Sequence, residues 1–289
     1  MYKPVLIKMA ASGIGRACCL AFVKEGAAGL VVADINLEGA QDTAAQARAI
    51  AVNPNFRVDA VKVDVTDMES MKAAIDHAVN SLGRIDYAVH SAGVSSVPNP
   101  ISDSANTWLT CTKIPGGTFD PIAEASFDDF KHLLDVNVNG TFLFTSLMSA
   151  AMKKQEPKQV SATNTARGTS RGSIVNLSSV SSFMAVANMV QYTTCKHAIV
   201  GITKTAALDN APLAIRVNCV CPTWTDTPMT RRATDVAPGL EQALLSTIPL
   251  ARLGLPEEAA DAVLFLSSFR SSFTTGTSLI LDGGMTLSC

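Results

Sequence analysis

The chain has 289 residues, of which 47% are hydrophobic, and its formal net charge at pH 7 is −2. This length is enough for one large α/β domain with its own hydrophobic core. The small net charge excludes the basic surface that nucleic-acid binding requires, and no stretch approaches the roughly 18 apolar residues of a membrane span. We therefore expect a cytoplasmic protein that binds neither nucleic acid nor a membrane.

Strand and helix patterns alternate along the whole chain. Short apolar, β-branched runs predict strands at 5–8, 30–34, 60–64, 87–90, 173–176, 215–220 and 278–281. Apolar residues at helical spacing predict helices at 14–25, 38–51, 67–81, 127–152, 190–209 and 256–268. This alternation indicates an α/β fold, a doubly wound parallel sheet with helices on both faces, in one domain over residues 1–289.

A glycine-containing turn follows the first predicted strand, where residues 10–17 read Ala-Ala-Ser-Gly-Ile-Gly-Arg-Ala. Glycine lets the backbone approach a pyrophosphate, and the following helix offers its N–H groups and positive dipole. Asp34 ends the second predicted strand about twenty residues further on, where a carboxylate binds a ribose 2′-hydroxyl and repels a 2′-phosphate. Unless Asp34 only starts a loop, this arrangement predicts a dinucleotide site that prefers NAD to NADP.

Two stretches interrupt the alternation, and we interpret both as loop insertions. Residues 98–121 contain four prolines and two glycines without apolar periodicity. They follow the fourth predicted strand, so they either border a site at that edge of the sheet or form a surface loop only. Residues 153–172 are polar and rich in serine, threonine and lysine. This composition predicts a disordered surface loop.

Polar residues also occur at one point of a predicted helix and at the end of a predicted strand. Asn137 falls within the helix predicted at 127–152, where its amide competes with the backbone. It is either functional, a tolerated polar residue, or part of a kink near Gly140. Ser178 and Ser179 follow the strand predicted at 173–176. The carboxyl ends of parallel strands are where open α/β sheets bind ligands, so both serines are candidate site residues.

Tyr192 and Lys196 are four residues apart in the helix predicted at 190–209, so they share one face of it. An ammonium close to a phenol favours the phenolate, which makes the hydroxyl a usable proton donor and acceptor. The spacing alone is common in helices, and it also fits a half-buried tyrosine beside a solvated lysine. Only the surrounding motifs favour catalysis.

In this order, these residues resemble the short-chain dehydrogenase/reductase family over nearly the whole chain. The resemblance implies a Rossmann-type sheet and a catalytic tetrad of Asn137, Ser179, Tyr192 and Lys196. In the family the tyrosine transfers the proton and the serine holds the substrate oxygen. The lysine supports the tyrosine and binds the nicotinamide ribose, while the asparagine anchors a water in the proton relay. The implied function is an NAD(P)-dependent oxidoreductase that interconverts a secondary alcohol and a ketone.

The resemblance also assigns the cofactor site. Asp64 and Val65 resemble the adenine-contacting pair, and residues 90–93 stand where the family has Asn-Asn-Ala-Gly. Residues 222–227 resemble the P-G-x-x-x-T segment that meets the nicotinamide amide. The cofactor-binding residues expected on this basis are Ser12, Gly13, Ile14, Gly15, Asp34, Asp64, Val65, Ala92, Gly93, Tyr192, Lys196, Pro222, Thr225 and Thr227.

The chain departs from the family pattern in three segments. Met9 stands where the first motif glycine belongs, Thr223 replaces the glycine after Pro222, and His90 and Ser91 replace the two asparagines. Either the site tolerates Met9, or cofactor binding is impaired, or the N-terminal sequence is in error. These departures leave two alternatives to the alcohol and ketone reaction. One is an epimerase or lyase of the same family, and the other is a catalytically impaired dinucleotide sensor or scaffold.

Expectations about the substrate and about self-association also follow from the resemblance. The segment after the sixth strand becomes a flap over the substrate in the family. Its apolar residues predict a small to medium alcohol or ketone with an apolar body. The fourth and fifth predicted helices imply a homodimer or homotetramer. The flap candidates are Trp224, Met229, Leu240, Leu244 and Leu245, and the contact candidates are Phe142, Phe144, Met148 and Met152.

The cysteines and histidines give no sign of a metal site. The seven cysteines contain no C-x-x-C pair. Cys219 and Cys221 alternate along a predicted strand, so they face the same side and are expected to pack there. The four histidines are scattered through the chain, which argues against zinc.

Overall fold

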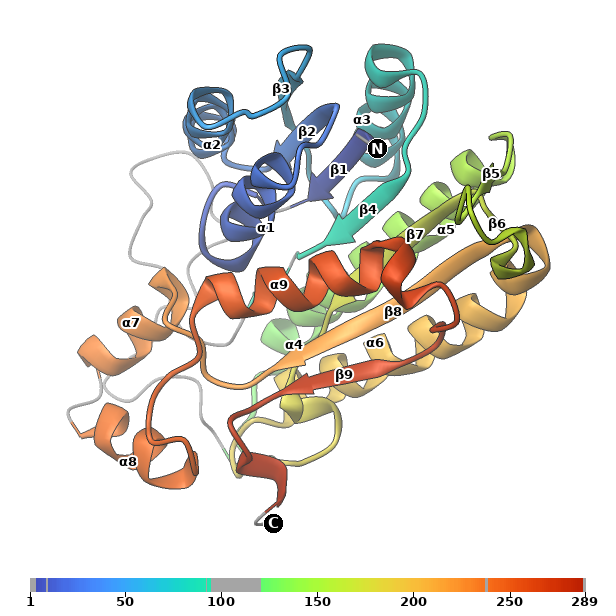
Figure 1. Cartoon of the computed structure of the whole chain (residues 1–289). Coiled ribbons are helices and arrows are strands. Elements are labelled where there is room, and N and C mark those ends of the chain that lie inside the picture. Colours follow the sequence, from blue (N-terminus) through green and yellow to red (C-terminus); the bar gives the residue numbers. More distant parts are fainter. Residues whose placement is uncertain (1–3, 9, 92, 95–120, 237–238, 288–289) are drawn as a thin grey trace.

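The computed structural model describes residues 4–8, 10–91, 93–94, 121–236 and 239–287. Its centre is a seven-stranded parallel sheet in the order β3-β2-β1-β4-β7-β8-β9 (Figure 1). The predicted fold class is confirmed. The strand order reverses between β1 and β4, and such a switch point is where open sheets of this kind bind ligands. The strands are β1 (Pro4–Lys8), β2 (Gly29–Asp34), β3 (Arg57–Lys62), β4 (Tyr87–His90), β7 (Gly172–Leu177), β8 (Ile215–Pro222) and β9 (Ser278–Leu281).

Helices cover both faces of the sheet, because successive strand residues point to opposite sides. Leu30 and Val32 pack on one side with α1, α2 and α9, whereas Val31 and Ala33 pack on the other with α3 and α5 (Figure 1). The helices on the first face are α1 (Gly13–Lys24), α2 (Leu37–Ala49) and α9 (Pro256–Ser267). Those on the second are α3 (Met68–Leu82), α4 (Phe127–Leu133), α5 (Gly140–Lys153) and α6 (Val190–Asn210).

Three details differ from the sequence-based prediction. The third strand is β3 at Arg57–Lys62 rather than 60–64, because pairing of Arg57 with Gly29 sets where it begins. The helix predicted at 127–152 is interrupted by a π-helix, η1 (Leu134–Asn139). Two helices after β8 were not predicted, α7 (Pro228–Val236) and α8 (Leu240–Thr247). Short 3₁₀ turns complete the chain at η2 (Thr165–Arg167), η3 (Val180–Ser182), η4 (Ala211–Leu213), η5 (Phe269–Ser271) and η6 (Met285–Leu287).

The second stretch interpreted as an insertion is ordered, so the prediction of a disordered loop at 153–172 is wrong. Its ends pair as a small antiparallel sheet of β5 (Lys158–Gln159) and β6 (Thr169–Ser170). The guanidinium of Arg167 at its tip donates to Ser272 Oγ at 2.7 Å. Composition predicted disorder because the segment has little apolar content, and polar contacts order it instead. The other stretch, 98–121, lies almost wholly outside the described residues.

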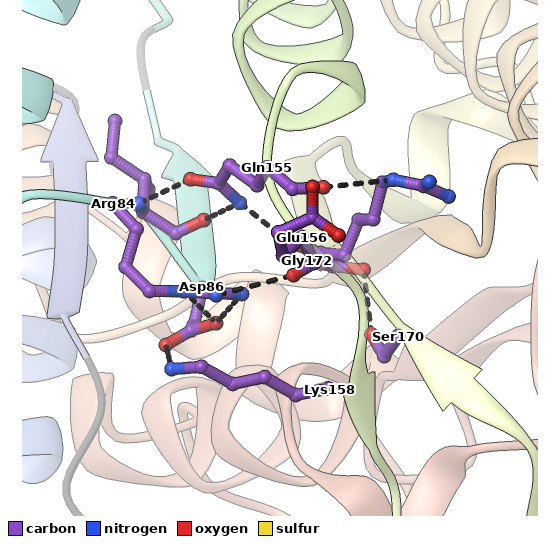
Figure 2. A network of polar contacts seen from close by, with 9 residues as sticks. Arg84, Asp86, Gln155, Glu156, Lys158, Ser170 and Gly172 are labelled. Carbon is purple, nitrogen blue, oxygen red and sulfur yellow. Dashed lines mark hydrogen bonds and ion pairs between the residues drawn. The ribbon is translucent and has the colours of Figure 1, made fainter.

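A polar network ties this small sheet to the amino ends of the main strands (Figure 2). The Gln155 side chain accepts the Ile85 N–H at 2.6 Å and donates to the carbonyls of Ile85 and Arg171. Beside it, the Asp86 carboxylate, whose side chain is 3% exposed, forms ion pairs with Arg84 at 2.7 Å and Lys158 at 3.5 Å. The network lies at the end of the sheet opposite its carboxyl edge.

Most of the expected contact residues on α5 are not available to a second chain. Phe144, Met148 and Met152 are fully buried against the sheet, whereas Phe142 is 58% exposed. Of the four, only Phe142 can therefore reach a partner. Among the described residues, no helix is both long and apolar enough to cross a membrane.

Candidate active site

The turn after β1 leads directly into α1, and Gly13 has a φ of +53° that a residue with a side chain rarely adopts. Ser12 is the N-cap residue of α1, but its side chain accepts no capping hydrogen bond. In contrast, the side chains at the N-caps of α2, α3 and α4 each accept a backbone N–H. The first-turn N–H groups of α1 therefore suit an anionic ligand, as a phosphate site at a helix N-terminus requires. Gly15 is buried within this turn, and Met9 lies outside the described residues.

The Asp34 carboxylate at the carboxyl end of β2 is held beside this turn. It accepts the N–H of Ala11 at 3.0 Å and that of Asn36 at 2.9 Å, and Asp34 is 6% exposed. The nearby Arg16 turns its guanidinium toward α2, where it meets Asp42 at 2.9 Å and Thr43 Oγ1 at 3.0 Å. Arg16 also donates to the carbonyl of Ala11 in the turn at 2.5 Å, so both the Asp34 carboxylate and the Arg16 guanidinium, which is paired with Asp42, lie next to the turn.

Asp64 and Val65 follow β3 at the same edge of the sheet. The Asp64 carboxylate is half-buried and accepts both the N–H of Thr66 at 2.8 Å and its hydroxyl at 2.7 Å. Val65 is buried, and a Cβ placed on Gly140 would lie 2.9 Å from the Val65 Cβ. Gly140 therefore allows the start of α5 to approach the Asp64–Val65 segment closely.

Asn137 sits in the π-helix η1, where one extra residue widens the helical turn. Its side chain is completely buried, and its amide bonds the Val94 backbone in both directions, accepting the N–H at 3.1 Å and donating to the carbonyl at 3.0 Å. The helix is therefore irregular at Asn137, as a π-helix rather than a kink, and the side chain has a specific backbone partner. Asn137 fixes the chain that leaves β4.

Gly93 lies between Asn137 and Lys196. A Cβ added at Gly93 would stand 3.0 Å from Asn137 Oδ1 and 3.3 Å from Lys196 Nζ. The absence of a side chain at this position lets the two functional groups come together from different helices. Ala92, which was also expected to bind the cofactor, lies outside the described residues.

Lys196 and Tyr192 share one face of α6, as their spacing predicted. Lys196 Nζ lies 5.3 Å from the centroid of the Tyr192 ring and 3.4 Å from the carbonyl oxygen of Leu177. Lys196 is only 4% exposed, so the interpretation of a solvated lysine is wrong. The hydroxyls of Ser178 and Ser182 donate to the Lys196 carbonyl at 3.0 and 2.8 Å. Ser182 could not be identified from the sequence alone, because its contact with Lys196 spans 14 residues of the chain.

A cavity of about 150 Å³, here called the central cavity, joins these elements. Ser179 and Tyr192 line it together with Ile14 from α1 and the segment from Pro222 to Thr227 after β8. Ser179 is buried and its hydroxyl accepts the Ser181 N–H at 3.2 Å. A Cβ added at Gly13 would lie 3.5 Å from the Thr227 methyl carbon, so the segment after β8 reaches the turn before α1. Asn137 and Lys196 are not among the residues that line this cavity.

The segment from Pro222 to Thr227 is held by its own threonines. Thr225 is buried and its hydroxyl donates to the Thr223 carbonyl at 3.0 Å. The Thr223 N–H donates to the carbonyl of Leu281 in β9 at 2.9 Å. Thr223 is not among the described residues with positive φ, so its backbone does not require the glycine of the family pattern.

The flap candidates divide into two groups. Trp224 and Met229 line the central cavity, whereas Leu240, Leu244 and Leu245 are not among its lining residues. Leu244 is buried within α8, as expected for a packing residue. The sequence did not point to Met184, Met189 and Met285, which also line the cavity from segments far apart in the chain.

The buried cysteines near the site behave as packing residues, as predicted. Cys219 and Cys221 are fully buried with their sulfurs 3.8 Å apart. The hydrogen bond with Cys219, together with burial, raises the pKa of Cys221 above its usual value. Burial raises the pKa of Cys195 to about 11. The described residues contain no group of three or more histidine, cysteine or acidic side chains suited to a metal ion.

Comparison with known proteins gives consistent matches along the chain. A family model described as short chain dehydrogenase matches residues 3–237. The chain is 51% identical to the short-chain dehydrogenase srdC of Neurospora crassa, over 96% of this chain and 94% of that protein. It is 47% identical to the short-chain dehydrogenase RED2 of Pyricularia oryzae, over 96% and 94%. The crystal structure of a 3-oxoacyl-(acyl-carrier protein) reductase from Brucella melitensis superposes with a TM-score of 0.78 at 33% identity, covering 97% of this chain and 90% of that one.

Proposed function

Because the chain belongs to the short-chain dehydrogenase family of NAD(P)-binding oxidoreductases, we propose that it interconverts a secondary alcohol and a ketone with NAD. The observation that carries this proposal is the position of Tyr192. Tyr192 lines the central cavity together with Ser179, and the Lys196 ammonium lies 5.3 Å from the centroid of the Tyr192 ring. Two hydroxyls thus line one cavity, and a cation lies close to the one that would transfer the proton, as carbonyl chemistry requires.

Each residue has a role that its contacts allow. The Tyr192 hydroxyl gives its proton to the carbonyl oxygen during reduction and takes it back during oxidation, and Ser179 donates a hydrogen bond to the same oxygen. Lys196 stabilises the negative charge that develops on the Tyr192 oxygen. Asn137 fixes the backbone of Val94 and thereby the position of Lys196 across Gly93. The nicotinamide, when bound, supplies or accepts the hydride.

The residues around α1 fit a dinucleotide. The α1 N-terminus has no side-chain cap from Ser12, and Gly13 adopts a backbone conformation that brings the turn close to Thr227. Ile14 and Gly15 complete this turn, and Asp64 and Val65 follow the neighbouring strand. Gly93, Pro222 and Thr225 border the same edge of the sheet. We propose that these residues bind the cofactor, with the pyrophosphate at the α1 turn.

A direct assay tests the proposed reaction. Purified protein is incubated with NADH or NADPH and a panel of ketones, and with NAD and the corresponding alcohols, while absorbance of the reduced nicotinamide is followed. We expect NADH-dependent reduction of at least one ketone class and oxidation of its alcohol. Cofactor binding without turnover of any ketone or alcohol would contradict the proposal and favour the sensor or scaffold alternative.

The preference for NAD should depend on Asp34. Its carboxylate is positioned to accept a ribose hydroxyl and to repel a 2′-phosphate, so Asp34→Ala should weaken NAD binding and strengthen NADP binding. A hydrogen bond to a charged group contributes about 1.5–3 kcal/mol. The dissociation constant for NADP divided by that for NAD should therefore fall by roughly 10–100-fold. Titration calorimetry with both cofactors measures this ratio.

The control for this prediction is Asp76→Ala. Asp76 is exposed on α3, so its replacement changes the net charge equally without touching the cofactor site. Equal affinity of the wild-type protein for NAD and NADP would overturn the assignment of Asp34. An equal change in the Asp76 variant would show that net charge, rather than contact, sets the ratio.

Two of the departures from the family pattern fit the fold without strain. Thr223 has an ordinary backbone conformation, and its hydroxyl donates to Met285 Sδ at 3.0 Å. His90 is buried in the core, where its ring stacks on Phe144 at 4.9 Å between centroids. Neither residue is strained in the fold, which favours the enzyme over the sensor or scaffold alternative. Self-association as a homodimer or homotetramer remains part of the proposal, with the exposed ring of Phe142 available for contact.

A further inference from the structure

The central cavity is uncharged among the described residues that line it. These residues are aliphatic, hydroxyl-bearing, aromatic or thioether side chains, and Tyr192 is the one that takes part in proton transfer. A carboxylate, phosphate or ammonium on the substrate would lose its hydration there without an opposite charge to replace it. Such a transfer is strongly unfavourable. The body of the substrate that enters this cavity is therefore uncharged.

Methionine is concentrated at this cavity. Of the ten methionines in the chain, Met184, Met189, Met229 and Met285 line it. They come from three separate regions: the segment between η3 and α6, the helix α7, and the turn η6. Because side chains from distant parts of the sequence converge on one small space, this grouping is a property of the folded cavity rather than of local composition.

One of these sulfurs is held in a fixed position. Met285 is 8% exposed, and its Sδ accepts a hydrogen bond from Thr223 Oγ1 at 3.0 Å. Thr223 is the residue that replaces the glycine of the family pattern, and its hydroxyl connects the segment after β8 to η6. The departure from the pattern therefore contributes to the cavity wall by orienting the Met285 thioether.

We propose that the substrate is an uncharged carbonyl compound, or the corresponding alcohol, whose body is a planar aromatic ring bound among these four methionines and Trp224. The proposal deepens the proposed function and rests on it. Thioether sulfurs make favourable contacts with aromatic rings, typically at about 5 Å and often at the ring edge. A saturated ring of the same size would bury similar apolar area without these contacts. Trp224, which lines the same cavity, adds an aromatic face for offset stacking.

Two matched pairs of ketones test the proposal. The first pair is 4-phenylbutan-2-one and 4-cyclohexylbutan-2-one, in which two methylenes insulate the same methyl ketone from an aromatic or a saturated ring. The second pair is 4-(4-methylphenyl)butan-2-one and 4-(4-carboxyphenyl)butan-2-one, which differ in charge. We expect kcat/KM with NADH to be about tenfold higher for the phenyl than for the cyclohexyl ketone, corresponding to about 1.4 kcal/mol. We expect the carboxylate to lower kcat/KM by at least as much.

Substitution of the methionines then identifies the cause of the preference. Met189→Leu and Met285→Leu nearly conserve side-chain volume and remove the sulfur. Each should lower the phenyl-to-cyclohexyl ratio of kcat/KM about threefold, because only the phenyl ketone loses contacts with the sulfur. Met68→Leu, at a methionine 54% exposed on α3, is the matched control and should leave the ratio unchanged.

The outcomes separate this inference from the proposed function. If both ketones of the first pair are reduced equally well, or if neither leucine variant alters their ratio, the aromatic assignment is overturned while the alcohol and ketone reaction stands. Efficient reduction of the carboxylate overturns the uncharged assignment in the same way. If no ketone of either pair is reduced in a Tyr192-dependent manner, the proposed function fails for this class and the inference falls with it.

Discussion

Tyr192→Phe is expected to lower kcat by about 10²–10⁴-fold, which is the usual contribution of a positioned general acid or base. The substitution keeps the ring beside the Lys196 ammonium and removes only the hydroxyl that lines the central cavity. Tyr192 is only partly buried, so the variant should fold and bind NAD as the wild-type protein does. Steady-state kinetics together with cofactor titration measure both effects.

Tyr87→Phe is the matched control for this substitution. Tyr87 begins β4 at the amino end of the sheet, where its ring packs on Phe22 at 5.6 Å between centroids. The same chemical change at this distance from the cavity should leave kcat within a factor of about two of the wild-type value, since no general acid or base is removed. If Tyr192→Phe also turns over at the wild-type rate, the assignment of the proton donor is wrong.

Asp86→Ala is expected to lower the free energy of unfolding by about 3–5 kcal/mol, because it leaves a cation behind without its buried partner. The Asp86 side chain is 3% exposed and that of Arg84 is 17% exposed, so water replaces little of the lost ion pair. A loss of this size is a large part of the stability of an ordinary domain. Urea denaturation at constant pH measures it. The folded fraction should keep its kcat, because the network lies at the amino ends of the strands and the cavity is lined by residues that follow the carboxyl ends of β7 and β8.

Asp128→Ala is the control for Asp86, because Asp128 pairs with Lys131 at 2.7 Å while its side chain is 88% exposed. An exposed pair contributes less than about 1 kcal/mol. If Asp86→Ala does not fold, the double variant Arg84→Met with Asp86→Leu should fold, because an apolar pair can replace a buried ion pair at little cost. Equal destabilisation by Asp86→Ala and Asp128→Ala would contradict the role assigned to the network.

The main sheet could be predicted from the sequence because its strands are short apolar runs separated by helical patterns. Tyr87–His90 and Ser278–Leu281 match the predicted bounds, and β3 differs because pairing with β2, rather than its own apolar pattern, decides where it begins. The small sheet of β5 and β6 was missed for a related reason. Its strands are only two residues long. The small sheet is ordered by contacts with residues that are distant in the sequence, from Gln155 to Ile85 and from Lys158 to Asp86.

In the candidate site, too, features set by local sequence could be predicted, whereas features set by contacts between distant segments could not. The spacing of Tyr192 and Lys196 predicted their shared helix face, and their order along the chain carried the family resemblance. The π-helix at Asn137 could not be predicted, since its apolar pattern is that of an ordinary helix. The approach of Asn137 and Lys196 across Gly93, and the grouping of methionines at the cavity, depend on chain segments that meet only in the fold.

The central claim is that the chain transfers a hydride between nicotinamide and a carbonyl carbon beside Tyr192. Isotope transfer tests it most directly, with NADH deuterated at one or the other C4 position and a ketone that the protein reduces. Mass spectrometry of the alcohol should find one deuterium on the carbinol carbon from one labelled form and none from the other, and Tyr192→Phe should slow this transfer without changing which form delivers it. An alcohol without deuterium from either form, or equal transfer rates in the wild-type and Tyr192→Phe proteins, would contradict the account.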